Sequence, residues 1–243
     1  MDKSTNGSVL VAAWSFRSAV ALAAFCSVLA PAARAHAYVM GERHITSDTV
    51  LKTDQYGSVV FDADDITLDC ANHQVHISSA SKPNCFSNQS KCAIVAYNHK
   101  NITIQNCAVV GGFDTRVAVD QSSAVTLDNV SATVTVNATA FHFEYTSDIV
   151  ANQLYMLGPK TGMFVKNTYR ANFSNIWIDS PHGKGVWSQY NNEDTYTNLI
   201  VWDEYDAPGF GLLAQHDIHL SVIDSEFDIT DHGSPVPCSA RCS

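Results

Sequence analysis

The sequence predicts an all-β fold, a right-handed parallel β-helix (solenoid) of about seven rungs. The first observation is internal repetition: the best self-match aligns seven segments, which after a first interval of 36 residues are spaced by 22 to 26 residues. The second is composition, since each repeat is rich in β-branched, aromatic, Asn and Thr residues and shows little helical periodicity. Such a unit cannot bury its own apolar face, so the repeats should stack at about 4.8 Å. The aligned segments start at Ser58, Ile94, Val117, Phe141, Met163, Val186 and Leu212.

The columns of this alignment indicate which side chains face the core. Like residues recur above like residues, and apolar columns lie two residues apart, as expected where alternate side chains of a strand point inward. The first strand contributes the column Ile94, Val117, Phe141, Met163, Val186 and Leu212 and the column Ala96, Val119, Phe143, Val165, Ser188 and Ala214. A second strand contributes Ile66, Ile102, Val125, Ile149 and Ala171.

A polar column follows the second strand of each repeat. Amide side chains stacked at strand spacing can hydrogen-bond along the column and satisfy turn backbone. We therefore expect an asparagine ladder with a structural role. Its members are Cys70, Asn106, Asn129, Gln153, Asn175, Asn198 and Asp224.

Two segments carry a family resemblance. The stretch from Tyr56 to His73 resembles the opening rung of many secreted right-handed β-helix proteins, and the stretch from Asn98 to Cys107 resembles their standard repeat. On this basis the chain is similar to the pectin lyase-like superfamily from about Ser58 to Asp228. The resemblance implies the fold but no single activity, because the superfamily includes lyases, hydrolases, epimerases and adhesins.

The ends of the chain have their own predictions. Residues 1–35 are typical of a cleaved signal peptide, with a basic start, an apolar run and the small-x-small site at Ala33 to Ala35. We expect a secreted protein, extracellular or periplasmic, with no membrane span after cleavage. The predicted parts are a signal peptide at 1–35, an N-terminal cap at 36–57, a parallel β-helix at 58–232 and a disulfide-bearing tail at 233–243.

Cysteine number and net charge limit the partners. Seven cysteines become six without Cys26, an even number that suggests disulfides in an exported chain. Six cysteines allow fifteen connectivities. The expected pairings are two local ones, Cys85 with Cys92 and Cys238 with Cys242, and one bridge between neighbouring rungs, Cys70 with Cys107. Without Lys3, Arg17, Arg34 and Asp2 the chain keeps 11 basic and 23 acidic residues, a formal charge of −12. Because this charge repels polyanions, we do not expect nucleic acid as a partner, and a strongly anionic polysaccharide is disfavoured.

The outward positions of the first strand are where similar enzymes hold a sugar chain. One outward column reads Val95, Ala118, His142, Phe164, Trp187 and Leu213; the other reads Phe61, Tyr97, Asp120, Glu144, Lys166, Gln189 and Gln215. Aromatic rings beside carboxylates, a cation and an amide suit sugar rings and hydroxyls. We predict substrate binding by Tyr97, Phe164, Trp187 and Gln189.

Catalysis is a further hypothesis for this strip. Asp120 and Glu144, one rung apart, are candidates for an acid and base or an acid and nucleophile of glycosidic hydrolysis. Lys166 with a lowered pKa, or His142, is a candidate base for β-elimination or epimerisation of a uronate. The competing interpretation is that charges alternating on a sheet face stabilise each other and need no substrate.

Metal sites are weakly indicated. Asp203, Glu204 and Asp206 form an acidic loop that offers hard oxygen ligands to Ca²⁺, but calcium-loop spacing is lacking, and no other metal or cofactor is predicted. The sequence therefore predicts a secreted polysaccharide-binding protein and leaves open lyase, epimerase or glycoside hydrolase activity. The alternative is a non-catalytic structural or adhesive cell-surface protein with the same coil.

Overall fold

The structure is a computed structural model that describes residues 39–76, 84–85, 90–112, 114–134, 137–179, 181–203 and 210–229. All of these belong to one unit, residues 37–243. The predicted signal peptide, the tail at 233–243 and the acidic residues Glu204 and Asp206 lie outside the described residues.

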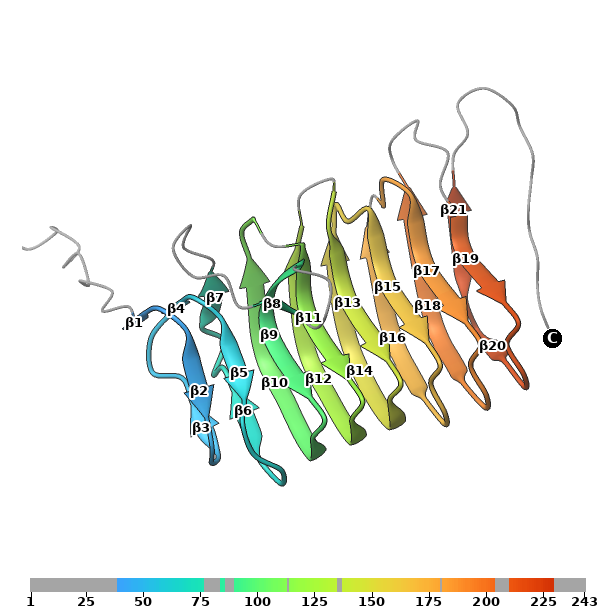
Figure 1. Cartoon of the computed structure of the whole chain (residues 1–243). Helices are drawn as coiled ribbons and strands as arrows, with labels where there is room; N and C mark the ends of the chain where they lie inside the picture. The colour runs from blue at the N-terminus through green and yellow to red at the C-terminus, as the bar shows by residue number, and fades with distance from the viewer. Residues whose placement is uncertain are drawn as a thin grey trace, which may run out of the picture. The chain divides into compact units, whose positions relative to one another are not determined.

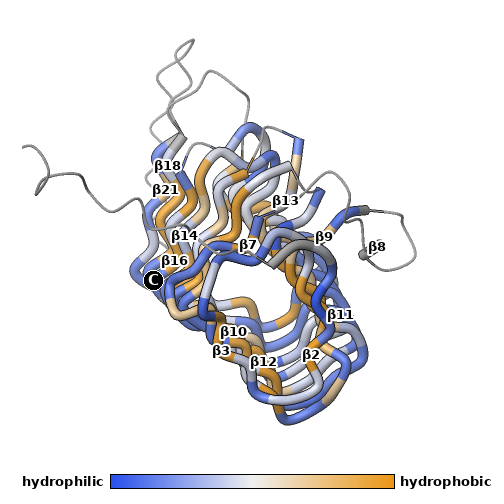
Figure 2. Tube along the Cα trace, turned by 90° about the vertical axis from the view of Figure 1, so that its left-hand side faces the viewer, coloured by the Kyte–Doolittle hydropathy of each residue, from blue (hydrophilic) through white to orange (hydrophobic). Residues whose placement is uncertain are grey.

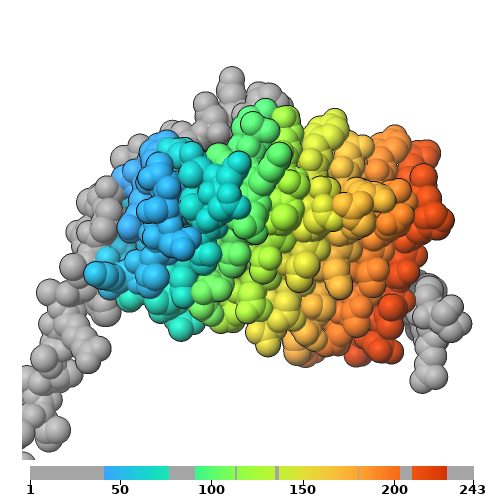
Figure 3. All heavy atoms as spheres, turned by 90° about the horizontal axis from the view of Figure 1, so that it is seen from below, coloured from blue at the N-terminus to red at the C-terminus, as the bar shows by residue number. Residues whose placement is uncertain are grey.

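The predicted β-solenoid is confirmed: parallel strands stack into two sheets that form about seven turns (Figure 1). Across the described residues every regular element is a strand, so no helix suited to crossing a membrane is found there. The successive rungs occupy successive bands of the molecular surface (Figure 3).

A nine-stranded sheet carries the first strand of each rung, in the order β19-β17-β15-β13-β11-β9-β5-β2, with the short β8 antiparallel to β9. Its strands are β2 (Arg43–Ile45), β5 (Val59–Phe61), β8 (Asn84–Cys85), β9 (Ser90–Tyr97), β11 (Thr115–Asp120), β13 (Thr139–Glu144), β15 (Thr161–Lys166), β17 (Lys184–Gln189) and β19 (Phe210–Gln215).

A twelve-stranded sheet carries the remainder of each rung. Its strands are β1 (Val39–Met40), β3 (Thr49–Val50), β4 (Gln55–Tyr56), β6 (Thr67–Asp69), β7 (Gln74–His76), β10 (Lys100–Val110), β12 (Ser123–Thr133), β14 (Ser147–Leu157), β16 (Asn172–Asp179), β18 (Thr195–Asp203), β20 (Ser221–Ile223) and β21 (Glu226–Ile229). Within the predicted cap at 36–57, residues 39–56 already contribute strands, since β2 pairs with β5 and β4 pairs with β7.

The core follows the predicted columns from β9 to β17, whereas in β19 Leu212 is half-buried and Ala214 is exposed. Val117 pairs with Ile94 on one side and with Phe141 on the other, and all three side chains are fully buried. Hydrophobic positions line up from rung to rung in the view along the stack (Figure 2). This regularity follows from strand alternation, which places every second side chain inside.

The predicted register of the first aligned segment, which starts at Ser58, is wrong by one residue. Val59, instead of Ser58, pairs with Ile94, so Phe61 lies beside Ala96 in an inward column and is only 2% exposed. A slip of one residue moves a side chain to the opposite face of a strand. Phe61 is therefore a core residue and does not belong to the outward column of Tyr97.

The asparagine ladder forms at a bend within the long strands of the twelve-stranded sheet. Asn106, Asn129 and Asn175 have φ values of 53°, 53° and 54°, in the left-handed region that Asn tolerates. The Asn129 amide donates to Asn106 at 3.0 Å, and Asn198 donates to Asn175 at 2.8 Å. Where Gln153 occupies the column, the preceding Asn152 accepts from Asn175 instead. The amides therefore connect rungs at a backbone turn.

The first member of the ladder differs from the prediction. Asp69, and not Cys70, accepts from the Asn106 amide, at 3.1 Å. Cys70 instead forms the predicted disulfide with Cys107 of the next rung. Cys92 is also disulfide-bonded; its pairing with Cys85 stays a prediction. Cys238 and Cys242 lie outside the described residues.

Candidate functional site

The two outward columns of the nine-stranded sheet form as predicted from β9 onward. In one column Asp120 pairs with Tyr97 and Glu144, and Lys166 pairs with Glu144 and Gln189. The neighbouring column runs Val95, Ala118, His142, Phe164, Trp187 and Leu213. Parallel register thus places the candidate side chains on one face, one rung apart.

A pocket of about 370 Å³ opens on this face across β13, β15 and β17. Five of the eight predicted site residues line it: His142, Glu144, Phe164, Lys166 and Trp187. Tyr97, Asp120 and Gln189 are not part of its wall. The wall also includes Thr139 and Thr161, which the sequence analysis did not single out. The repeat alignment contained a signal for them, since each threonine lies two residues before an aligned start, Phe141 or Met163. The two threonines pair with each other at the starts of β13 and β15.

Glu144 is the centre of the polar side of the pocket. One carboxylate oxygen lies 2.7 Å from Lys166 Nζ and the other lies 3.3 Å from His142 Nε2. The hydrogen bond to Glu144 raises the pKa of Lys166 above its usual value. This shift is opposite to the lowered pKa that the lysine route requires, so the site gives no support to Lys166 as the base.

His142 packs between the polar and aromatic sides of the pocket. Its ring centroid lies 4.9 Å from that of Phe164, and burial lowers its pKa, against the opposing effect of Glu144. Since the ordinary pKa of histidine is already below 7, the ring is neutral at neutral pH. A neutral imidazole is able to accept a proton or to hydrogen-bond a hydroxyl group.

Asp120 sits beside the pocket and is buried. Its side chain is only 6% exposed. Burial and, next, the charge of Glu144 raise its pKa to about 6. Among the described residues its Oδ1 has no hydrogen-bond partner. The outward Val95 and Ala118 are also buried, in a small apolar cluster with Cys92. The strip is therefore buried at Val95, Ala118 and Asp120 and open along β13 to β17, while the predicted binding residue Tyr97 on β9 is 47% exposed but lies outside the pocket.

The aromatic side consists of Phe164 and Trp187. Their ring centroids are 5.0 Å apart with an edge-to-face angle of 71°. Lys184 places its Nζ 3.3 Å from the centroid of the Trp187 ring, a cation–π contact absent from the sequence-based prediction. Gln189 donates to Gln215, which also accepts from the Trp187 indole at 3.4 Å. Gln189 thus contacts the residue that holds the Trp187 indole, and it does not line the pocket itself.

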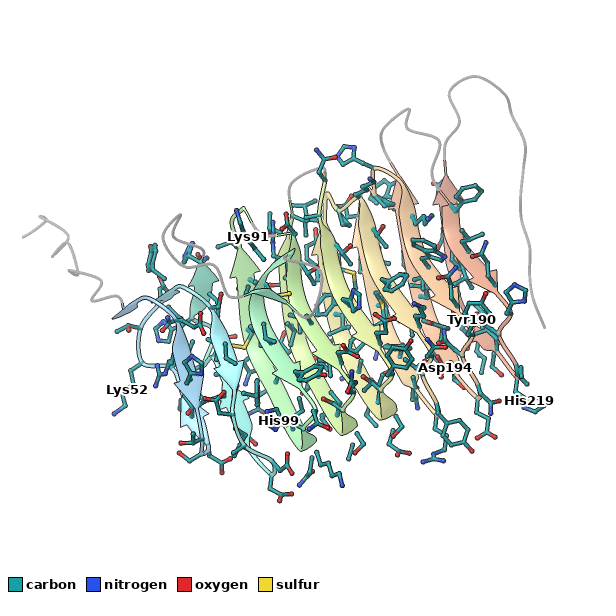
Figure 4. All side chains as sticks on the ribbon, viewed as in Figure 1. Lys52, Lys91, His99, Tyr190, Asp194 and His219 are labelled. Carbon is teal, nitrogen blue, oxygen red and sulfur yellow. A yellow bond between two sulfur atoms is a disulfide. The ribbon has the colours of Figure 1, made fainter. Side chains whose placement is uncertain are left out.

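The acidic loop of Asp203, Glu204 and Asp206 lies almost entirely outside the described residues, so the weak Ca²⁺ site stays a prediction. No cluster of three His, Cys, Asp or Glu residues suited to a metal occurs among the described residues. Asp217 accepts a hydrogen bond from the backbone N–H of Asn191, at 2.9 Å. This contact belongs to a polar network that connects equivalent turns of successive rungs, in which Asp194 accepts from Thr168 at 2.6 Å. Asp194 is labelled in Figure 4, at the turn between β17 and β18.

Comparison with known proteins adds little to this geometry. No protein family model matches the sequence, and a search of curated proteins finds no match. Among solved structures, QnrB1, a plasmid-mediated fluoroquinolone resistance protein, is 8% identical with a TM-score of 0.23, over 79% of this chain and 92% of that chain. A similarity at this level carries no argument about function.

Proposed function

We propose that this protein is a secreted polysaccharide-binding protein that holds a sugar chain in the pocket over β13, β15 and β17. The observation that carries the proposal is the joining of two aromatic rings, Phe164 and Trp187, with the hydrogen-bonding group of Glu144, His142 and Lys166 in one pocket wall. Aromatic rings pack against the apolar faces of sugars, and the polar groups bind hydroxyls.

The charge balance of the pocket favours a neutral sugar chain. The carboxylate of Glu144 is compensated by the ammonium group of Lys166, and His142 is neutral at neutral pH. A uronate polymer would meet Glu144 in the pocket and the −12 formal charge that the chain keeps without residues 1–35. A cationic polymer would compete with Lys166 for Glu144.

Export and family membership belong to the same proposal. Residues 1–35 have the features of a signal peptide, and the segments from Tyr56 to His73 and from Asn98 to Cys107 resemble the pectin lyase-like superfamily. The parallel coil is compatible with that superfamily, whose members include binders, enzymes and adhesins.

Titration calorimetry of the purified chain against neutral glucans, mannans and uronate polymers tests the proposal. A neutral polymer should bind, and Phe164→Ala and Trp187→Ala should each weaken it about ten-fold or more. Trp202→Ala, an equal truncation on the other sheet, is the matched control and should leave binding unchanged. Failure to bind any polysaccharide would favour the alternative, a structural or adhesive cell-surface coil.

Glycosidic hydrolysis is a second candidate, favoured by the pair Asp120 and Glu144. A carboxyl group with a pKa near 6 beside an ion-paired carboxylate fits the division between acid and nucleophile or base. β-Elimination with neutral His142 as base is the corresponding lyase route. Counting reducing ends and recording ultraviolet absorbance of unsaturated products separates the two. Turnover that persists in both Asp120→Asn and Glu144→Gln would exclude these residues as the catalytic pair.

A further inference from the structure

A second aromatic surface lies on the outer face of the twelve-stranded sheet, away from the pocket of the first sheet. Parallel pairing places Tyr155 beside Trp177 on adjacent rungs, and Trp202 beside Asp179. Since Trp177 and Trp202 differ by one rung and by two residues along the strand, they are diagonal neighbours on the same face, with Cα atoms about 7–8 Å apart.

These rings are unusually open to solvent for their size. Trp177 and Trp202 are each 41% exposed, and Tyr155 is 40% exposed. The Tyr155 and Trp177 rings are 6.4 Å apart between centroids. Contiguous exposed apolar surface of this kind marks binding sites on soluble proteins more often than scattered single residues do.

A pocket of about 260 Å³ lies between the two indoles and the last strand of the sheet. Its wall combines Trp177 and Trp202 with Ile200 and with the carboxylates Glu226 and Asp228 of β21. Asp228 pairs with Trp202, and Glu226 pairs with Ile200, which in turn pairs with Trp177, so each acid continues the column of one indole. The pocket therefore has flat apolar walls and an acidic end.

The charge of this pocket is not compensated within the described part of the chain. No Lys, Arg or His there forms an ion pair with Glu226 or Asp228. Exposed indole faces attract cations as well as apolar groups, and a nearby carboxylate strengthens that preference. An anionic ligand would be repelled, and a neutral one would leave the carboxylates unused.

We propose that this surface is a second binding site, specific for sugar oligomers with free amino groups, such as glucosamine oligomers. The sugar rings stack on Trp177 and Trp202, and the ammonium groups contact Glu226 and Asp228. A linear oligomer suits the site because the aromatic and acidic groups continue over three rungs, β16, β18 and β21, at about 4.8 Å per rung. The inference does not rest on the proposed function of the first pocket.

Calorimetric titration of the purified chain with a glucosamine tetramer and with its fully N-acetylated counterpart, at about pH 6 and low salt, tests this site. The two tetramers share ring shape and differ in charge, since only the free amines take up a proton at mildly acidic pH. The amino form should bind at least about ten-fold more tightly. Equal binding of both tetramers, or no binding of the amino form, would overturn the proposal.

Variants assign the binding to this face. Trp202→Ala and Trp177→Ala should each weaken the amino tetramer about ten-fold, and Glu226→Gln combined with Asp228→Asn about five-fold. Tyr145→Ala, which truncates an aromatic ring that is 56% exposed and lines neither pocket, should retain the parent affinity. Circular dichroism and thermal unfolding establish folding; if Trp177→Ala does not fold, the exposed Trp202 and the acidic pair still decide the outcome. An oligolysine of equal charge that binds as tightly would show that sugar rings are not recognised.

Discussion

The outer faces of the two sheets both carry aromatic rings, but with different electrostatic surroundings. On the nine-stranded sheet, Glu144 is held by Lys166 and His142, and Lys184 covers a face of Trp187. On the twelve-stranded sheet, Trp177 and Trp202 border Glu226 and Asp228, which form no ion pair among the described residues. The two faces should therefore select ligands of different charge.

The difference arises because equivalent backbone positions of the solenoid carry different side chains. The backbone repeats with the same parallel pairing on both sheets, so the backbone imposes no charge preference. Each rung adds one outward residue to each column. The identity of that residue on a single rung decides whether a carboxylate has a cation beside it or has none. A solenoid thus allows two independent binding surfaces on one core.

Removing Glu144 should have the largest effect on this contrast. Glu144→Ala leaves the half-buried ammonium group of Lys166 without its carboxylate and removes a hydroxyl acceptor. The affinity for a neutral polysaccharide should fall about 10- to 100-fold, about 1.4–2.8 kcal/mol. Calorimetry measures it, with the glucosamine tetramer as internal control, since its affinity should not change. Equal weakening of both ligands would show that the faces are coupled.

Asp120 should make stability depend on pH. Its folded-state pKa of about 6 exceeds the ordinary 3.8, so the folded chain binds the proton more tightly than the unfolded chain does. Its contribution to stability is fully present below about pH 4 and is lost as the pH rises through 6. Asp120→Asn should therefore raise the free energy of unfolding by about 1–2 kcal/mol at pH 8, relative to its effect at pH 4.

Urea unfolding at both pH values measures this effect. Because the charge of Glu144 contributes to the shift, the same substitution in a Glu144→Gln background should show a smaller pH dependence. A stability difference that is the same at pH 4 and pH 8 would contradict the ionisation argument.

Salt should distinguish the two faces by a smaller amount. Between about 0.05 and 0.5 M NaCl, the glucosamine affinity should fall several-fold, because screening weakens the attraction between ammonium groups and exposed carboxylates. The neutral-polysaccharide affinity should change less than two-fold, about 0.4 kcal/mol. Parallel titrations across the salt series check both, and an equal salt response would remove the electrostatic distinction.

The smallest effect is expected at the bend that carries the asparagine ladder, which lines neither pocket. Asn175 has a φ of 54° and connects Asn152 to Asn198 in the ladder. Asn175→Gly keeps the backbone conformation but loses the hydrogen bonds of the side-chain amide. Asn175→Ala loses them too and adds the steric cost of a Cβ at positive φ, so it should lower the free energy of unfolding by about 0.5–1 kcal/mol more than Asn175→Gly does. Urea unfolding should rank the parent above Gly and Gly above Ala. Both variants should bind both ligands as the parent does.

Much of the fold was predictable because the repeat is regular. Phe141, Met163 and Val186 occupy equivalent places, and their parity alone identifies the core. The prediction failed at Phe61, where the interval of 36 residues removes the regular spacing that fixes register. The ladder lost Cys70 for a different reason, since a disulfide to Cys107 occupies its sulfur.

The candidate site was predictable only in part. The sequence placed Asp120, Glu144 and Lys166 in one column, as the register confirms. It did not show that Asp120 is buried while Glu144 lines a pocket. The lysine expected to have a lowered pKa has a raised one, because its nearest partner is a carboxylate.

The sequence by itself determined the repeat, the inward and outward columns and the amide ladder, because alternation along a strand is a local property read every second residue. Only the tertiary structure decided which outward residues are open, which charges pair and where a second aromatic pocket forms. Those properties depend on side chains from other rungs and on what packs over the face, at distances that no single repeat contains.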